Sequence, residues 1–327
     1  LNNDANLTTV GKKSIKIIDG SLFKMEDTVA NRNEFPHSCK QKMGLGFPSI
    51  RLLGVFCMRS GALLDLELGK FKGKGEGETS LLQKMLDRFT PGDVLVMDRF
   101  FTSYFLLNDL MDRKIDFIVR MRDRKGYKLM KAQNVQGDGV VTLKKKIEIN
   151  SIGSKAPLKM QLRFIEKVIS QPGFRDKKLY LATSLTDLPM NEICEVLKRR
   201  WDIEINFRHL KSTLGMRYLR CKDPMMIVKE IWTNMIAYNL IRRIMFDTGL
   251  TGFNSRYASF KTALSALLLQ TASGLNPKKY VQIILKVATV KQKSKERYEP
   301  RAIKRRGSLM PFLTIPRLEA RLKHWGY

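Results

Sequence analysis

Long apolar runs, paired cysteines and clustered histidines are all scarce in this chain of 327 residues. No stretch of about 18 apolar residues occurs, so we expect no membrane-spanning helix. The four cysteines show no Cys-x-x-Cys spacing, which argues against a disulfide scaffold or a zinc site and fits a reducing compartment. The three histidines are too few and too dispersed for a histidine-based metal centre.

The amino terminus has neither a starting methionine nor the basic and apolar regions of a secretory signal. We expect that the chain begins inside a longer protein. Its 43% hydrophobic residues can bury a substantial core, and its length predicts about two domains.

Acidic residues are the scarce charge. Only 31 Asp and Glu stand against 60 Lys and Arg, which gives a formal net charge of +29. Self-repulsion of this size calls for a polyanionic partner, so nucleic acid is the first candidate and an anionic membrane the second. Residues 120–178 and residues 278–327 each carry a net +11. Such clustering favours a nucleic-acid footprint, with a solubilising tail as the alternative.

Strand and helix signals alternate in the first part of the chain. Apolar and β-branched runs predict five strands, of which the second and third form a hairpin. They cover residues 14–18, 50–58, 62–68, 93–97 and 115–121. Helical spacing of apolar residues predicts helices at 78–89 and 103–113. This order predicts a mixed sheet with helices packed on its faces.

The pattern changes after residue 121. Short β-prone stretches between Gly and Ser turns predict an antiparallel β insertion, with strands at 139–143, 146–149, 160–165 and 178–182. Helices are then expected at 191–214, 224–246, 260–269 and 279–287. We divide the chain into the first part of a core (1–121), the insertion (122–189), the core helices (190–246) and a basic, helical C-terminal region (247–327).

Three acidic residues stand out by position. Asp19 ends the first expected strand, Asp98 ends a central strand, and Glu204 lies in the helix expected at 191–214. Strand ends of open α/β sheets are where ligands bind. Because carboxylates repel a polyanion, they fit this basic chain as ligands of Mg²⁺, which binds carboxylate and phosphate oxygens together. Two such ions about 3.5–4 Å apart can activate the nucleophile and steady the leaving oxygen at a phosphodiester.

The helix expected at 191–214 places three charged residues on one stripe. At about 100° per residue, Arg200, Glu204 and Lys211 fall within about 40° of one another. This stripe borders the apolar one, whereas a merely solvated face lies opposite it. The apolar stripe comprises Ile203, Phe207, Leu210 and Leu214. Either Arg200 and Glu204 form an ordinary i,i+4 ion pair, or Glu204 binds a metal beside cations that hold DNA phosphates.

This helix resembles the signature of bacterial insertion-sequence transposases of the Asp-Asp-Glu class, in the group with a Tyr, Arg, Glu and Lys pattern (insertion sequence four type). Arg200, Glu204 and Lys211 match that pattern, and residues 197–212 read Leu-Lys-Arg-Arg-Trp-Asp-Ile-Glu-Ile-Asn-Phe-Arg-His-Leu-Lys-Ser. Leu197 departs from it, because it occupies the Tyr position and offers no hydroxyl to a phosphate.

Three earlier segments resemble the same family. Asp19-Gly20-Ser21 is similar to its first-Asp motif, and residues 91–101 are similar to its second-Asp motif, with Phe100 where Gly is more common. Residues 46–51 resemble a segment before the second strand. The resemblance runs from about residue 16 to residue 242.

The resemblance implies an α/β fold, with an RNase H-like mixed sheet flanked by helices and the β insertion between the second Asp and the Glu. It implies cleavage of transposon ends and joining of 3′ hydroxyl ends to target DNA. In that mechanism Asp19, Asp98 and Glu204 bind Mg²⁺, for which Mn²⁺ can substitute. Hairpin intermediates and a separate N-terminal DNA-binding region are common in this family.

The resemblance also implies where the protein works and with what. Transposon-end and target DNA are the expected partners, a homodimer is expected in the DNA complex, and no membrane is involved. We expect a bacterial, cytoplasmic, nucleoid-associated protein. The candidate DNA-binding residues are Arg99, Arg200, Trp201 and Lys211.

Several alternatives stay open. A non-catalytic DNA-binding relative is favoured by Leu197, and an RNase H-like nuclease or resolvase acting on branched DNA is the third hypothesis. Trp201 is either a packing residue or a base-stacking platform. Glu78 is interpreted as a structural acid at the start of a helix, where it suits the helix dipole. Four aromatic residues of the insertion either stack on an unpaired base or form a small core: Tyr127, Phe164, Phe174 and Tyr180.

Overall fold

The computed structural model describes residues 9–10, 13–37, 46–145, 156–169, 177–249, 259–273, 316, 318–319 and 322–323. The chain divides into two compact units. The first comprises residues 1–23, 51–69 and 73–215, and the second comprises residues 24–50, 70–72 and 216–327. The expected strand at 146–149, the expected helix at 279–287 and Phe174 lie outside the described residues.

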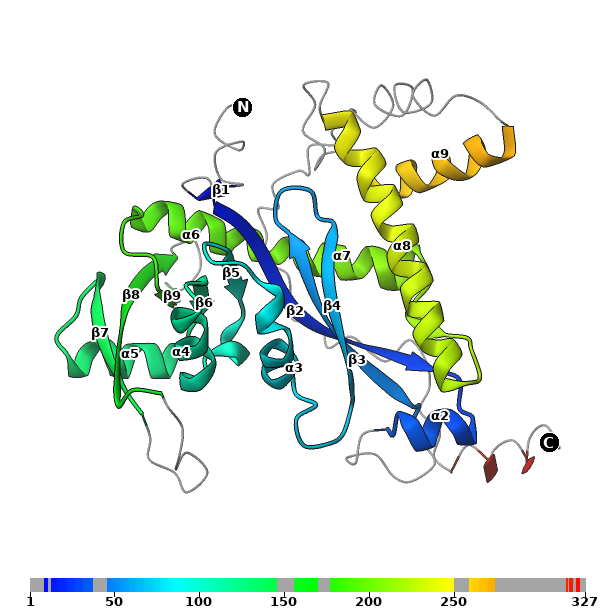
Figure 1. The fold of residues 1–327 in the computed structure, drawn as a ribbon, viewed down its shortest axis with the longest axis horizontal. Coiled ribbons are helices and arrows are strands. Elements are labelled where there is room, and N and C mark those ends of the chain that lie inside the picture. The colour runs from blue at the N-terminus through cyan, green and yellow to red at the C-terminus, as the bar shows by residue number, and fades with distance from the viewer. Residues whose placement is uncertain are drawn as a thin grey trace. The chain divides into compact units, whose positions relative to one another are not determined.

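One mixed sheet organises the described strands (Figure 1). Its order is β4-β3-β2-β5-β6-β9-β8-β7, and the short strands β1 and β10 pair with β2. The early strands are β1 (Thr9–Val10), β2 (Lys13–Met25), β3 (Ser49–Cys57), β4 (Leu63–Lys70), β5 (Val94–Met97) and β6 (Asp116–Arg120). The later strands are β7 (Asp138–Lys144), β8 (Lys159–Ile169), β9 (Lys177–Thr183) and β10 (Tyr218–Leu219).

The strand pairing is mixed, as expected from the element order. β2, β5 and β6 are parallel neighbours, whereas β9 pairs antiparallel with β6, and β7 and β8 continue the antiparallel pairing. β3 and β4 form the expected hairpin, because the short connection between two neighbouring strands leaves no room for a crossover. One expectation is wrong: β2 does not end at Asp19 but continues to Met25.

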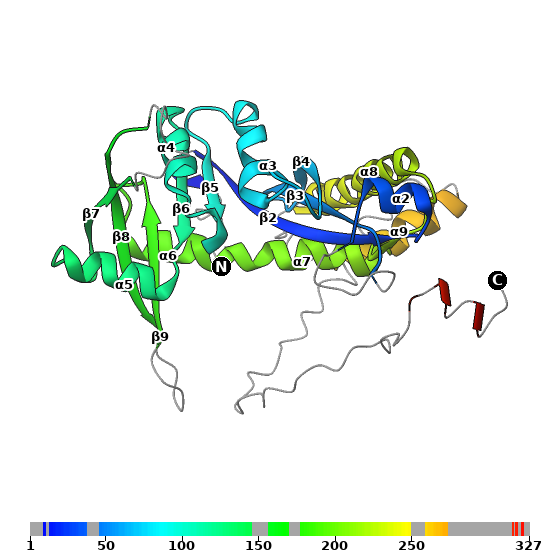
Figure 2. The same ribbon diagram turned by 90° about the horizontal axis from the view of Figure 1, so that it is seen from below.

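Helices cover both faces of this sheet (Figure 2). α3 (Glu78–Met85) and α4 (Tyr104–Asp112) lie on one side of β2, β5 and β6, and α6 (Met190–Lys198) and α7 (Asp202–Arg208) lie on the other. On the α3 side, Ile18 of β2 belongs to the same buried cluster as Leu81 and Leu82 of α3. On the other side, the ring of Phe207 in α7 meets Phe56 of β3 edge-on at 5.3 Å.

The insertion contains a helix that the sequence reading missed. α5 (Asp123–Ala132) covers β9, where Gly126 packs so tightly that a Cβ would lie 2.6 Å from the ring atom Cγ of Tyr180. The apolar pattern did not predict α5, because this helix is mostly polar and buries only Met130 and Gly126. Phe164 and Tyr180 are buried and serve as core residues, whereas Tyr127 is 45% exposed.

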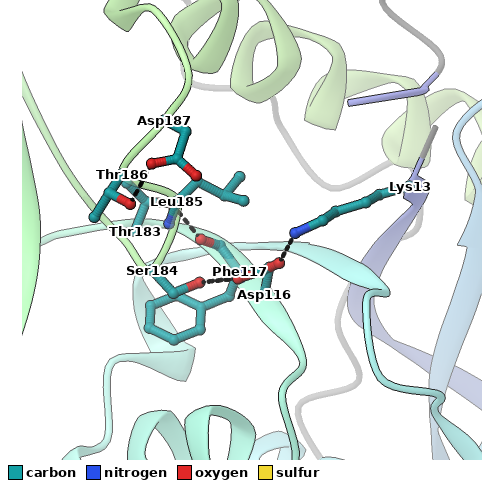
Figure 3. A network of polar contacts seen from close by, with 8 residues as sticks. All are labelled: Lys13, Asp116, Phe117, Thr183, Ser184, Leu185, Thr186 and Asp187. Atoms are coloured by element: carbon teal, nitrogen blue, oxygen red, sulfur yellow. Dashed lines mark hydrogen bonds and ion pairs between the residues drawn. The ribbon is translucent and has the colours of Figure 1, made fainter. Parts of the chain in front are cut away.

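Polar contacts fasten the end of the insertion to the core sheet (Figure 3). Thr183 Oγ1 donates a hydrogen bond to the carbonyl of Phe117 at 2.6 Å. Ser184 Oγ donates to Asp116 Oδ1 at 2.9 Å, and Lys13 Nζ pairs with the other oxygen of Asp116 at 2.5 Å. These bonds connect β2, β6 and the residues after β9, so the chain leaves the insertion from a fixed place.

The second unit contains α2 (Val29–Glu34), α8 (Pro224–Gly249) and α9 (Phe260–Ser273). α9 packs against α8, and the expected helices at 224–246 and 260–269 are confirmed. Asn31 of α2 is buried and donates to the carbonyls of Glu26 and Cys221 at 3.0 and 3.1 Å. Within the part of the chain that the structure describes, no helix has the length and apolarity to span a membrane.

Candidate active site

The register of two parallel strands brings Asp19 and Asp98 side by side. β2 pairs with β5 at Ile15 with Val94 and at Ile17 with Val96, and the same register continued by two residues sets Asp19 opposite Asp98. Parallel neighbours lie about 4.8 Å apart, so the two backbones are adjacent although the residues are far apart in sequence. An ion pair at 2.5 Å between Lys16 of β2 and the buried Asp93, which directly precedes β5, supports the same register.

Asp19 is held in an environment that disfavours its charge. Burial raises the pKa of Asp19 to about 6, and the negative charges of Glu78 and Asp98 act in the same direction. A hydrogen bond from the backbone N–H of Gly20 at 2.9 Å and the nearby Arg200 guanidinium oppose the rise in this pKa without cancelling it. A carboxylate pair that repels itself in this way is stabilised by any cation placed between its members.

Glu78 lies against the backbone beside Asp19, which the sequence reading did not anticipate. A Cβ on Gly20 would lie 2.5 Å from Cδ and 2.6 Å from Cγ of Glu78, so the missing side chain makes room for the glutamate. Burial raises the pKa of Glu78; the charge of Arg51 lowers it and that of Asp98 raises it. Glu78 therefore belongs to the same electrostatic cluster as Asp19 and Asp98.

Two hydrogen bonds hold the start of α3 in place. The Arg51 guanidinium donates to the carbonyl of Glu76, just before the helix begins. Thr79 Oγ1 donates to the carbonyl of Phe100 at 3.3 Å, which ties α3 to the turn that follows Asp98. A hydrogen bond thus connects the segments that carry Glu78 and Asp98, in addition to the repulsion between the two carboxylates.

The signature helix is present but changes pitch twice. Residues 199–201 form a 3₁₀ turn between α6 and α7, and residues 209–213 form a π turn after α7. A helical wheel with a constant turn of about 100° per residue therefore gives only approximate positions for the residues of this segment. Ile203, Phe207 and Leu210 are buried as expected, whereas Leu214 is half-buried.

The three signature side chains have three different environments. Arg200 is buried, and its Nη1 lies 3.7 Å from Asp19 Oδ2. Lys211 lies in the π turn, with its Nζ 5.0 Å from the centre of the Phe23 ring. Glu204 is exposed on α7. The structure thus brings Arg200 to the acidic cluster and displays Glu204 on the surface.

The remaining candidates are also placed. Trp201 is 60% exposed, which favours the stacking interpretation over the packing one, and its ring centre lies 5.9 Å from the Arg200 guanidinium. Arg99 is exposed just after Asp98 and lies over the exposed ring of Phe100 at 5.6 Å. Leu197, at the signature's Tyr position, is buried with 6% exposure.

The donor chemistry of this cluster suits a hard divalent cation. Asp19, Asp98 and Glu78 offer carboxylate oxygens, and the carboxyl end of Glu78 occupies the space beside Gly20 that a Cβ would fill. As they stand, however, no three Asp, Glu, His or Cys side chains among the described residues lie close enough together to hold an ion.

Comparison with known proteins places this arrangement in a family. The chain is 25% identical over 305 residues to the transposase InsG for insertion sequence element IS4 of Escherichia coli (strain K12), an alignment covering 88% of this chain and 67% of that protein. It is 23% identical over 156 residues to "Putative transposase y4zB" of Sinorhizobium fredii (strain NBRC 101917 / NGR234), covering 46% of this chain and 42% of that protein. Residues 10–240 match the family model of the transposase DDE domain, and the chain therefore belongs to that family.

Proposed function

We propose that this chain is a metal-dependent transposase that cleaves transposon ends and joins their 3′ hydroxyl ends to target DNA. The observation that carries the proposal is the adjacency of Asp19 and Asp98 in a chain of formal charge +29 whose residues 10–240 match the DDE domain. Carboxylates repel phosphate, so in a chain that binds a polyanion they need a cation that binds carboxylate and phosphate oxygens together.

Each residue has a distinct part in this mechanism. Asp19, Asp98 and Glu204 would hold two Mg²⁺ ions, or Mn²⁺ in their place. Bound divalent ions supply activation of the attacking oxygen and stabilisation of the leaving oxygen. Arg200, buried beside Asp19, orients that carboxylate and presents its guanidinium to a phosphate oxygen.

The other candidate residues would contact the backbone and bases of DNA; Arg99 and Trp201 are exposed, and Lys211 is half-buried. Arg99 and Lys211 neutralise phosphates, and Trp201 offers a stacking surface for a base. Two protomers assemble on a pair of transposon ends, on the nucleoid DNA of a bacterial cell. Affinity for DNA falls steeply with salt, because each phosphate contact releases a counterion.

Labelled end DNA tests this function directly. The wild-type chain is expected to nick the end and join it to a target duplex in Mg²⁺ or Mn²⁺, and to do neither in EDTA. Asp98→Asn and Glu204→Gln should bind the same DNA without cleaving it. Wild-type rates in either variant would show that the carboxylates are not catalytic.

A second candidate is a DNA-binding relative without catalysis. Leu197 favours it, because a buried leucine replaces the signature tyrosine. Calorimetric titration of Mn²⁺ separates the two functions, since a chain without catalysis has no need of a cation site. A junction-specific nuclease is the third alternative, and comparing cleavage of linear ends with cleavage of four-way junctions distinguishes it.

A further inference from the structure

The insertion helix α5 presents a row of positive charges to solvent. Arg124, Lys128 and Lys131 are exposed, and at about 100° per residue they lie within about 60° of one another around the helix. The two buried residues of this helix, Gly126 and Met130, lie on the opposite side, where α5 packs against β9. We call the three exposed cations the α5 stripe.

The α5 stripe has no acidic partner in the part of the chain that the structure describes. Two cations of the neighbouring strands do have one. Arg163 pairs with Asp138 at 2.6 Å, and Lys178 pairs with Glu166 at 2.7 Å. The insertion therefore neutralises charges on its strands and leaves the stripe without a counter-charge.

This arrangement lowers the stability of the helix itself. Arg124 and Lys128 are four residues apart, and Lys128 and Lys131 are three apart, so these like charges are neighbours that repel each other. Arg124 also lies in the first turn, where the helix dipole disfavours a cation. Asp123, the one acidic residue of α5, pairs with Arg120 outside the helix at 3.4 Å. A face that served solubility alone would carry charges of both signs, so the stripe indicates an anionic partner.

The rest of the exposed surface of α5 favours nucleic acid over anionic lipid. A helix that lies on a membrane presents a large apolar face to it. In α5, all of whose residues the structure describes, the one large hydrophobic residue that is exposed is Tyr127. Lys131 Nζ lies 5.6 Å from the centre of the Tyr127 ring, so the ring positions this ammonium group beside the stripe.

The length of the stripe matches the spacing of charge on DNA. Arg124 and Lys131 are seven residues apart, which corresponds to a rise of about 10.5 Å along the helix. One strand of B-DNA carries about three phosphates over that length of duplex. Three cations in a row on one face can therefore each meet a phosphate of the same strand.

We propose that the α5 stripe binds the phosphate backbone of duplex DNA without reading its base sequence. In the sheet, β6 separates β9, which α5 covers, from β5 and the adjoining Asp98, so this surface lies apart from the acidic residues of the candidate active site. The inference rests on the proposed function, because it takes DNA as the partner. It adds a surface that holds the substrate and takes no part in the reaction.

Binding of the full chain to a labelled duplex of arbitrary sequence tests the stripe, with fluorescence anisotropy measured across a series of NaCl concentrations. EDTA is present so that no strand is cut. The triple variant Arg124→Gln, Lys128→Gln and Lys131→Gln removes the charges and keeps residues that favour a helix. We expect its affinity to be about 10- to 100-fold weaker at physiological salt, and the slope of log affinity on log salt to fall by about two to three.

A matched control removes the same net charge from three separate elements. Lys84, Lys222 and Lys229 are exposed, and the triple variant with Gln at these positions should lose less than about threefold in affinity, because scattered charges act only through the screened long-range field. An equal loss in the two triple variants would show that net charge matters and the stripe does not, which overturns the inference.

Variants that keep the charge of the stripe test its chemistry. Arg124→Lys, Lys128→Arg and Lys131→Arg together should bind DNA as the wild type does. Tyr127→Leu should weaken binding by about two- to fivefold, and Tyr127→Phe should not, because the ring alone positions Lys131. Equal affinity in the Leu and Phe variants would overturn the positioning role of this ring.

The outcomes separate this inference from the proposed function. At saturating end DNA, the variant without the stripe charges should join strands at the wild-type rate, since the stripe holds substrate only. Wild-type affinity and salt slope in that variant overturn the inference and leave the transposase proposal standing. A wild type that binds through the stripe but never nicks or joins overturns the transposase proposal alone. Stripe-dependent binding to phosphatidylserine vesicles in preference to the duplex would overturn DNA as the partner of α5.

Discussion

Two helices that cover the mixed sheet, α3 and α7, each carry a glutamate, and the two side chains have different environments. Glu78, at the start of α3, is half-buried against a glycine and lies among like charges. Glu204, in α7, is exposed between two changes of helical pitch. Contacts within the chain thus determine the position of the Glu78 carboxylate, whereas the side chain of Glu204 lies on the exposed side of its helix.

Asp98→Asn should have the largest effect, because Asp98 sits beside both Asp19 and Glu78. DNA joining is expected to fall at least about 1000-fold, since losing a metal ligand removes several kcal/mol of transition-state stabilisation. Single-turnover joining of labelled end DNA measures this loss. The folded state serves as the control, and a rate within a few fold of wild type contradicts the assignment.

Glu204→Gln should separate catalysis from DNA binding. Joining is expected to fall by about 100-fold or more, because Glu204 is one of the carboxylates proposed to hold the metal ions. The affinity for end DNA should stay close to that of the wild type, since Glu204 is exposed and the substitution keeps the shape of its side chain. Joining at the wild-type rate would contradict the role proposed for Glu204.

Leu197→Tyr tests whether the signature hydroxyl can be restored on α6. Leu197 is buried, so a larger polar side chain is expected to destabilise the fold by about 3 kcal/mol rather than raise activity. Urea unfolding measures the loss. Leu197→Phe separates the effect of volume from that of the hydroxyl, and a stable, more active Tyr variant would show that this side chain can reach the site.

Asp19→Asn is expected to stabilise the chain in EDTA by about 3 kcal/mol at pH 8. The pKa of Asp19 is about 6 in the folded state against 3.8 for an ordinary aspartate, so folding favours the protonated form. The penalty for its charge is absent below pH 4, grows as the pH rises toward 6 and is complete above it. Thermal unfolding measured across this pH range should show the unfolding temperatures of the wild type and Asp19→Asn converging at low pH. A difference that does not change with pH would contradict the raised pKa of Asp19 as its cause.

Thr79→Val should have the smallest effect. It removes the 3.3 Å hydrogen bond to the Phe100 carbonyl that ties α3 to the turn after Asp98. A loss of about 0.5–1 kcal/mol in unfolding free energy is expected, with slightly weaker Mn²⁺ binding. Thr233→Val, which removes a comparable exposed bond within α8, should change stability alone.

Much of the fold could be read from the sequence because its elements have strong local patterns. The buried run before Asp98, the hairpin of β3 and β4 and the helices α3 and α4 all follow from apolar spacing and turn residues. The course of β2 through Asp19 could not be read, since Asp19-Gly20 is a turn signal that pairing in the sheet overrides. α5 was missed because it buries few apolar residues.

The candidate site was predictable in its parts but not in its contacts. The family signature pointed to Asp19, Asp98 and Arg200, and the strand register and the Arg200–Asp19 ion pair bring these three together. Convergence of Glu204 with the two aspartates stays a prediction. Glu78 was assigned a structural role, because a first-turn acid looks the same in sequence whether or not a glycine far away makes room for it.

Gly20 has a consequence for how such a protein can decay. One methyl group at this position would displace a carboxylate without opening a cavity or straining the backbone. A chain altered there is expected to keep its fold, because only the flexible end of one side chain has to move. Under the proposed function, such a change would be detected by measuring strand joining and not by measuring the stability of the folded chain.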